Sequence, residues 1–341
     1  MKIYVIKVVA VLCLFLVACT RVDVCEEASH PHKALVSVNY LCDNAVATDS
    51  MVLIAYRPVN DWKCGYMCSP LTAEGRYIFN RPEWLPADSK DFAVRCGELF
   101  FFTFSYKKDD FNYRNIEDSK AVTGGNIAVS QKTYSLDKHP KDYAREWDNL
   151  NAYAPYVLSS DDIMYQKVGP VGVPLNNYTL DLEPRSIMKD ISVDVEIISS
   201  GVEIEKVVGE LSGVCYNFNF IRGEYDKGNT AKMLFEMSKV AGDTYSAMLS
   251  AMSVVPNEKH NIYSGDGILQ LQLHTIMPDG GKKVYTARLN LINTLFGIKD
   301  NLECIGGSCA IKPEVALKVD KSGISAQKVS SPYVDNWLLS K

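Results

Sequence analysis

The amino-acid sequence predicts an all-β protein: two tandem antiparallel β-sandwich domains with few short helices. Three observations support this prediction. Several segments alternate strictly between apolar and polar residues, Gly- and Pro-rich turns separate them, and helical periodicity is scarce. A chain of 341 residues, at roughly 100–200 residues per domain, favours two domains.

Two kinds of strand are expected. Residues Val36–Tyr40, Val193–Ile197 and Leu269–His274 alternate apolar with polar side chains, which is typical of strands with one face on a core. Residues Met51–Tyr56 and Leu99–Phe104 are almost continuously apolar, which indicates central strands buried on both faces.

Turn signals complete the expected architecture. Pro278-Asp279-Gly280-Gly281 between two strand patterns predicts a hairpin, and His139–Trp147 is the best candidate for a short helix. The cleanest alternation begins after Glu183, which places a domain boundary there. We therefore expect a signal peptide over residues 1–18, a linker over 19–33, an N-terminal sandwich over 34–182 and a C-terminal sandwich over 183–341.

The N-terminus has the pattern of an export signal. Lys2 and Lys7 precede the apolar run Val8–Ala18, which is much shorter than the roughly 20 residues that a membrane-spanning helix requires. The tetrapeptide Leu16-Val17-Ala18-Cys19 resembles the lipoprotein box of bacteria, which implies cleavage before Cys19 and acylation of that residue. The alternative is a cysteine that happens to follow an ordinary cleavage site.

The residues after Cys19 bear on location. Asp23, Glu26 and Glu27 resemble the surface-export signals of Bacteroidetes lipoproteins, although three carboxylates are also compatible with a solvated linker. We expect a lipid-anchored protein of the outer membrane, exposed at the cell surface.

Eight cysteines follow Cys19, and two close pairs are disulfide candidates. Cys304 and Cys309 flank Gly306-Gly307; a two-residue hairpin there would place the cysteines opposite each other, and we predict a disulfide. Cys64 and Cys68 are the other pair. A zinc site at that pair would need two further ligands at standard spacing, which do not appear, so no metal is expected.

No catalytic motif is found, and no enzyme activity or cofactor is expected. The five histidines lie outside any metalloprotease pattern, and no nucleophile elbow, P-loop or dinucleotide fingerprint occurs. The acidic pairs Asp109–Asp110 and Asp161–Asp162 lie in loop-like stretches where carboxylates are usually solvated. A net charge of −5 without a basic block argues against nucleic acid as a partner.

Trp62 and Trp84 occur in loop-like stretches and are candidate binding residues. Exposed indoles there would stack on sugars or contact a protein. The alternative is that they cover the ends of the sandwiches.

Short motifs across the mature chain resemble fimbrillin-related lipoproteins of Bacteroidales. They are the Cys25…His30-Pro31-His32 opening before the Val36 strand, Pro184–Ile187 leading into Ile191–Val195, and Val334–Trp337 near the end. The resemblance implies two transthyretin-like sandwiches and a role as fimbrial subunit, base anchor or accessory protein. It also implies assembly by strand exchange, in which proteolysis removes a first strand and a neighbour's strand replaces it.

A chain tethered through Cys19 would lose its anchor together with its first strand. We therefore expect a non-enzymatic anchor or accessory subunit of pilus assembly or adhesion that acts by β-strand complementation. Its partners would be the membrane, through the N-terminal lipid, and other fimbrial subunits or surface proteins, with residues 324–341 free for a partner. The alternative is a surface lipoprotein that binds glycans through aromatic loops.

Overall fold

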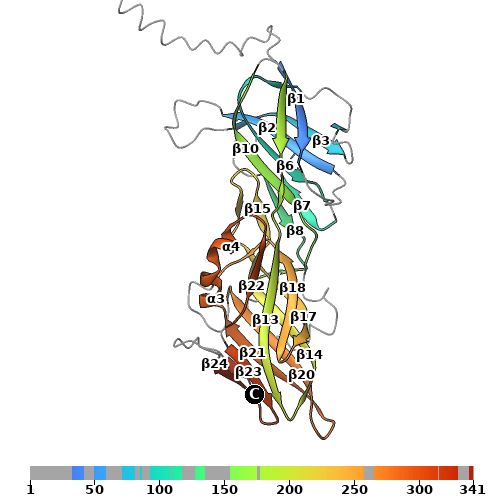
Figure 1. The fold of residues 1–341 in the computed structure, drawn as a ribbon, viewed down its shortest axis with the longest axis vertical. Coiled ribbons are helices and arrows are strands. Elements are labelled where there is room, and N and C mark those ends of the chain that lie inside the picture. The colour runs from blue at the N-terminus through green and yellow to red at the C-terminus, as the bar shows by residue number, and fades with distance from the viewer. Residues whose placement is uncertain are drawn as a thin grey trace, which may run out of the picture.

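The computed structural model describes residues 33–41, 50–58, 71–80, 85–86, 93–107, 109–116, 127–134, 154–174, 177–256, 265–313, 315–328 and 338–340. Within them the chain is built almost entirely of strands, which confirms the predicted all-β class. Figure 1 shows an elongated molecule with β1 near one end and the strands of the C-terminal half at the other. The predicted helix at His139–Trp147 lies outside the described residues.

The N-terminal half contains a three-stranded and a six-stranded sheet. The smaller sheet has the order β11-β1-β5, with β1 parallel to β11. Its strands are β1 (Lys33–Tyr40), β5 (Ala93–Arg95) and β11 (Tyr178–Leu182). The larger sheet has the order β12-β10-β6-β2-β3-β4. Its strands are β2 (Ser50–Pro58), β3 (Leu71–Asn80), β4 (Leu85–Pro86), β6 (Gly97–Ser105), β10 (Met164–Val173) and β12 (Arg185–Ser186).

A third sheet joins the two halves of the chain. It has four strands in the order β16-β15-β8-β7. The N-terminal half contributes β7 (Phe111–Arg114) and β8 (Ala128–Gln131), and the C-terminal half contributes β15 (Asn217–Asn219) and β16 (Glu224–Tyr225). A hairpin of the C-terminal half thus pairs in space with strands from before the boundary predicted at residue 183.

The six-stranded sheet lies between the other two, so both of its faces are buried. Along β2, Leu53 packs with β1 and β11, whereas Ile54 packs on the opposite side with β8 and β15. Phe101 and Phe102 of β6 divide in the same way. The prediction that Met51–Tyr56 and Leu99–Phe104 are buried on both faces is therefore confirmed.

Most of the C-terminal half belongs to a twelve-stranded sheet that folds over a single core and also includes β9 from the N-terminal half. Its main path is β24-β23-β13-β18-β17-β14-β20-β21-β25, with β9, β19 and β22 paired at its sides. Its strands are β9 (Tyr156–Val157), β13 (Lys189–Ser200), β14 (Glu203–Cys215), β17 (Thr230–Ala241), β18 (Thr244–Ala251), β19 (Ser253–Val254), β20 (Ile268–Ile276), β21 (Lys282–Asn290), β22 (Ser308–Ile311), β23 (Val315–Asp320), β24 (Ile324–Lys328) and β25 (Leu338–Ser340).

The core of this sheet follows the predicted alternation. Val193, Val195 and Ile197 of β13 meet Leu271 and Leu273 of β20 in one buried cluster. Two short helices, α3 (Ile292–Gly297) and α4 (Lys299–Glu303), follow β21 and contribute buried leucines to the same cluster. Neither helix is predicted from the sequence pattern.

The predicted hairpin between β20 and β21 is confirmed. All nine residues of β20 pair in antiparallel register with β21, from Ile268↔Asn290 to Ile276↔Lys282. At the turn, the Met277 amide donates to the Gly281 carbonyl at 2.7 Å, and Gly280 has a φ of +81° that favours glycine. The prediction that only one face of β20 is buried is wrong, because Gln270 and Gln272 are buried as well.

The predicted hairpin at Gly306–Gly307 is also wrong. Cys304 ends helix α4, and β22 then pairs parallel with β13 instead of antiparallel with a preceding strand. The loop is held against residue 186, since a Cβ atom on Gly306 would lie 2.6 Å from the Ser186 carbonyl oxygen. Cys304 and Cys309 are both free thiols in the structure, so the predicted disulfide is not formed there.

Candidate functional site

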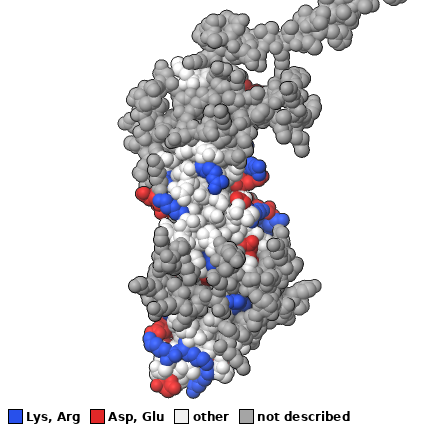
Figure 2. All heavy atoms as spheres, turned by 180° about the vertical axis from the view of Figure 1, so that it is seen from behind, with Lys and Arg blue, Asp and Glu red and all other residues white. Residues whose placement is uncertain are grey.

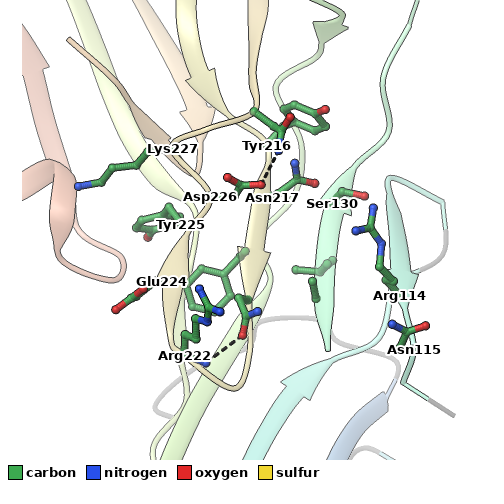
Figure 3. Close-up of a pocket in the computed structure, with 15 residues that line it drawn as sticks. Arg114, Asn115, Ser130, Tyr216, Asn217, Arg222, Glu224, Tyr225, Asp226 and Lys227 are labelled. Atoms are coloured by element: carbon green, nitrogen blue, oxygen red, sulfur yellow. Dashed lines mark hydrogen bonds between the residues drawn. The ribbon is translucent and has the colours of Figure 1, made fainter. Parts of the chain in front are cut away.

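A polar hollow of about 810 Å³ lies on the outer face of the four-stranded sheet, where the two halves of the chain meet. Figure 3 shows its walls, with Arg114 and Asn115 on one side and Arg222 and Glu224 on another. We call it the junction hollow. It is lined by Arg114, Asn115, Ala128, Val129, Ser130, Tyr216, Asn217, Phe218, Asn219, Arg222, Glu224, Tyr225, Asp226, Lys227 and Asn229.

Strand register arranges the floor of the junction hollow in rows. In one row, Glu224 pairs with Asn219, Asn219 with Ala128, and Ala128 with Arg114. With about 4.8 Å between neighbouring strands, this row is roughly 14 Å long. Because alternate residues of a strand share a face, the next row places Asn217 beside Ser130. The small side chain of Ala128 leaves space at the centre of these polar groups.

Aromatic side chains on the inner face of the same strands hold this floor in place. Phe218 and Phe220 are fully buried, and the Phe220 ring stacks on Phe104 with centroids 4.3 Å apart. Two phenols fix the hairpin to the backbone: Tyr165 donates to the Phe220 carbonyl at 2.5 Å, and Tyr225 donates to the Ile187 carbonyl at 2.8 Å. The polar face is therefore displayed on a packed platform.

The turns at the edge of the junction hollow are closed by local hydrogen bonds. The Asn219 side-chain oxygen accepts from the Arg222 amide at 2.9 Å, and Gly223 follows with a φ of +70°. Asp226 accepts from the Gly228 amide at 3.0 Å and from the Asn229 side chain at 2.8 Å. The Asp226 carboxylate is thus committed to its own turn.

Some charged side chains of the junction hollow have an ion-pair partner among the described residues, and others do not. Lys227 forms an ion pair with Glu303 at 2.8 Å. Burial lowers the pKa of Lys167, and the nearby Glu224 carboxylate opposes that shift. Arg114 and Arg222 are exposed, and neither forms an ion pair with any residue that the structure describes. Within the described part of the chain, nothing neutralises these two guanidinium groups, so they can bind an anion.

The two predicted site residues that the structure describes, Cys304 and Cys309, do not line the junction hollow. Cys19, Trp62, Trp84, Cys64 and Cys68 are outside the described residues, and their roles stay predictions. Cys304 and Cys309 lie beside the buried ammonium of Lys189, which donates to the carbonyl groups of Cys304 and Gly306.

The sequence analysis missed the polar face of the junction hollow. Its signal is nevertheless present, because Phe111-Asn112-Tyr113-Arg114 and Asn217-Phe218-Asn219-Phe220 each alternate aromatic with polar residues. Such alternation predicts two strands with a polar face, but it cannot show that strands about a hundred residues apart share one sheet.

The described part of the chain holds no cluster of three or more His, Cys, Asp or Glu side chains placed to bind a metal ion. None of its helices has the length and apolar character needed to cross a membrane.

Comparisons with known proteins find similar structures only. No family model matches the chain, and no curated protein does. A candidate adhesin from Bacteroides ovatus has a TM-score of 0.48 at 14% identity, covering 89% of this chain and 97% of its own. The fimbrial anchor protein Mfa2 from Porphyromonas gingivalis has a TM-score of 0.47 at 14% identity, covering 90% and 95%. A candidate adhesin from Bacteroides thetaiotaomicron has a TM-score of 0.47 at 11% identity, covering 89% and 100%.

These neighbours belong to the class that the sequence resemblance names, fimbrial and adhesin-like proteins of Bacteroidales. Their identities are low and their TM-scores are below 0.5.

Proposed function

We propose that this chain is a non-enzymatic, lipid-anchored surface protein that acts as an anchor or accessory subunit in fimbrial assembly or adhesion. The observation that carries the proposal is the core shared by the two halves. Phe102 and Phe104 from the N-terminal half pack in one cluster with Phe218, Phe220 and Met252 from the C-terminal half. A subunit that carries load between a membrane and a partner needs such a joint.

Further connections across the joint support this role. Strand β9, which precedes the predicted boundary, pairs parallel with β17 of the large C-terminal sheet. Strand β12, which follows the boundary, pairs with β10 of the N-terminal half. Because strands cross the joint in both directions, bending the molecule there would break backbone hydrogen bonds as well as apolar contacts.

The ends of the molecule fit a tether at one end. In Figure 1, β1 lies in the upper part and the C-terminus is marked near the lower end. Cys19 precedes β1 by 14 residues, so a lipid on Cys19 would hold the N-terminal half towards the membrane and leave the C-terminal half to project away from it.

The edge at β21 supports strand complementation. Strand β21 spans nine residues, but on its outer side β25 pairs only with Thr286, Ala287 and Arg288. No other described strand pairs with this side of β21, so the backbone on either side of the short pairing can accept a partner's strand. The segment expected to be free is used at both of its ends, since Ile324–Lys328 forms β24 on β23 and Leu338–Ser340 forms β25 on β21.

Membrane attachment is tested with Cys19→Ser, compared with Cys13→Ser as the matched control within the signal region. We expect the Cys19→Ser protein to leave the membrane fraction and the control to stay in it. A Cys19→Ser protein that fractionates with membranes like the wild type would contradict the proposal. The partner role is tested by deleting residues 330–341, the segment predicted to bind the partner, which should abolish co-purification of fimbrial subunits. Capture that persists after β25 is removed would instead assign the partner to the edge of β21.

Glycan binding through aromatic loops is the second candidate function. On the described part of the face in Figure 2, positive and negative side chains are interspersed. A glycan array with the wild type, Trp62→Ala and Trp84→Ala tests the aromatic loops. Saturable binding that either substitution abolishes would favour this candidate.

A further inference from the structure

We propose that the junction hollow binds an acidic oligosaccharide, one that carries carboxylate groups on its sugar rings. The inference rests on the proposed surface location, because such ligands are met outside the cell. It does not depend on Trp62 or Trp84.

The charge of the ligand follows from the two arginines. Arg114 is the last residue of β7, at one edge of the four-stranded sheet. Arg222 lies in the turn between β15 and β16, at the opposite edge of the same sheet. Neither has an acidic partner among the described residues. A guanidinium group binds a carboxylate through two parallel hydrogen bonds, so two separated arginines favour a ligand with more than one carboxylate.

The saccharide character follows from the floor between the arginines. Asn217 and Ser130 present an amide and a hydroxyl group, which both donate and accept hydrogen bonds, whereas the Asn219 oxygen already accepts from the Arg222 amide. Neighbouring hydroxyl groups of a sugar ring require both. Tyr216 adds one aromatic ring at the edge, against which a sugar can pack.

An acidic peptide fits this surface less well. Peptides are usually held through apolar side-chain pockets or by pairing with a strand edge. Here the ligand would lie across the face of the sheet, and the apolar residues Phe218, Val129 and Tyr225 contribute to the core below the floor. A floor row of roughly 14 Å, three interstrand spacings, has room for two or three sugar rings.

The test is titration calorimetry of the membrane-purified chain in detergent with tetragalacturonate. Its methyl ester is the matched ligand, because it has the same sugar backbone without the charges. We expect saturable binding of the acid, weaker binding at higher salt, and no saturable binding of the ester. Equal binding of acid and ester would overturn the proposal, as would binding of neither.

Protein variants locate the site. Arg114→Ala and Arg222→Ala should each weaken binding about tenfold, and Arg114→Lys should weaken it less, because it keeps the charge. Arg185→Ala, which removes an exposed arginine outside the junction hollow, should bind like the wild type. Ala128→Phe should abolish binding by filling the floor. Unchanged affinity in the Arg114→Ala/Arg222→Ala double variant would overturn the proposal.

Two controls separate this proposal from others. The arginine variants should unfold at the wild-type temperature, since both side chains are exposed. A hexaglutamate peptide serves as the rival ligand, and its binding in place of tetragalacturonate would overturn the saccharide assignment. Loss of sugar binding with membrane attachment and partner capture intact would leave the proposed anchor function standing.

Discussion

At the scale of single residues, Glu210 is a buried carboxyl group of the C-terminal half. Its side chain is buried on β14, where the Tyr156 hydroxyl donates to one carboxylate oxygen at 2.7 Å. The other oxygen has no hydrogen-bond partner. Burial raises the pKa of Glu210, and the charges of Lys232 and Arg288 only partly oppose the shift.

Glu210→Gln should therefore change how stability depends on pH. A carboxyl group with a raised folded-state pKa is ionised more easily in the unfolded chain. Its ionisation lowers the free energy of unfolding as pH rises from the ordinary carboxyl value of 4.5 towards the folded value, and the loss persists above it. Glutamine cannot ionise, so urea unfolding should show the variant gaining stability relative to the wild type between pH 4 and pH 8.

The control for this experiment is Glu203→Gln, at an exposed position of the same strand. Its stability relative to the wild type should change little between the two pH values. A Glu210→Gln difference that is the same at pH 4 and pH 8 would contradict the assigned cause.

The thiols provide a second test at residue scale. Cys304 is exposed, whereas Cys215 is fully buried and its pKa is raised by burial to about 12. Without reductant, iodoacetamide should modify Cys304 in the native protein at pH 8 and should modify Cys215 only after unfolding. Peptide mapping by mass spectrometry identifies each site. If Cys304 and Cys309 both resist iodoacetamide until reductant is added, the two residues form the disulfide predicted from the sequence, and the structure is contradicted at this point.

At the scale of elements, the hairpin β15–β16 matters more than its five strand residues suggest. Phe220, directly after β15, lies within stacking distance of Phe102, Phe104 and Tyr165 from the N-terminal half. The hairpin therefore supplies both the inner core and the outer floor of the junction hollow.

Phe220→Ala should lower the free energy of unfolding by about 3–5 kcal/mol, because it leaves a cavity where the two halves meet. Hydrogen exchange should accelerate in β6 as well as in β15, although the substituted residue belongs to the C-terminal half. Phe296→Ala is the control: that ring is 45% exposed on α3, and its loss should cost about 1 kcal/mol or less. Faster exchange confined to the C-terminal half would refute the shared core.

The sequence predicts an element well when residues close to it in the chain determine its structure, and poorly when distant residues do. The alternation of Val193–Ile197 and the turn at Pro278–Gly281 depend on neighbouring residues, and both predictions are confirmed. The Gly306–Gly307 turn is also local, but its conformation is decided by contact with residues 186–190. Burial of Gln270 and the pairing of β8 with β15 depend on segments far apart in the chain, so no local pattern reveals them.

At the scale of the whole molecule, the strands that cross the joint make the two halves one structural unit. Two β-sandwich domains joined only by a linker would bend at that linker. A shared core and strands that cross the joint instead transmit force from one end of the molecule to the other. This property connects the fold to the proposed anchor role. It also predicts that the halves are not stable independently of each other.

Differential scanning calorimetry of the full chain tests this claim most directly. A molecule with one shared core should unfold in a single transition whose calorimetric enthalpy equals its van't Hoff enthalpy. Two resolved transitions, one for each half, would contradict a rigid unit built across the joint.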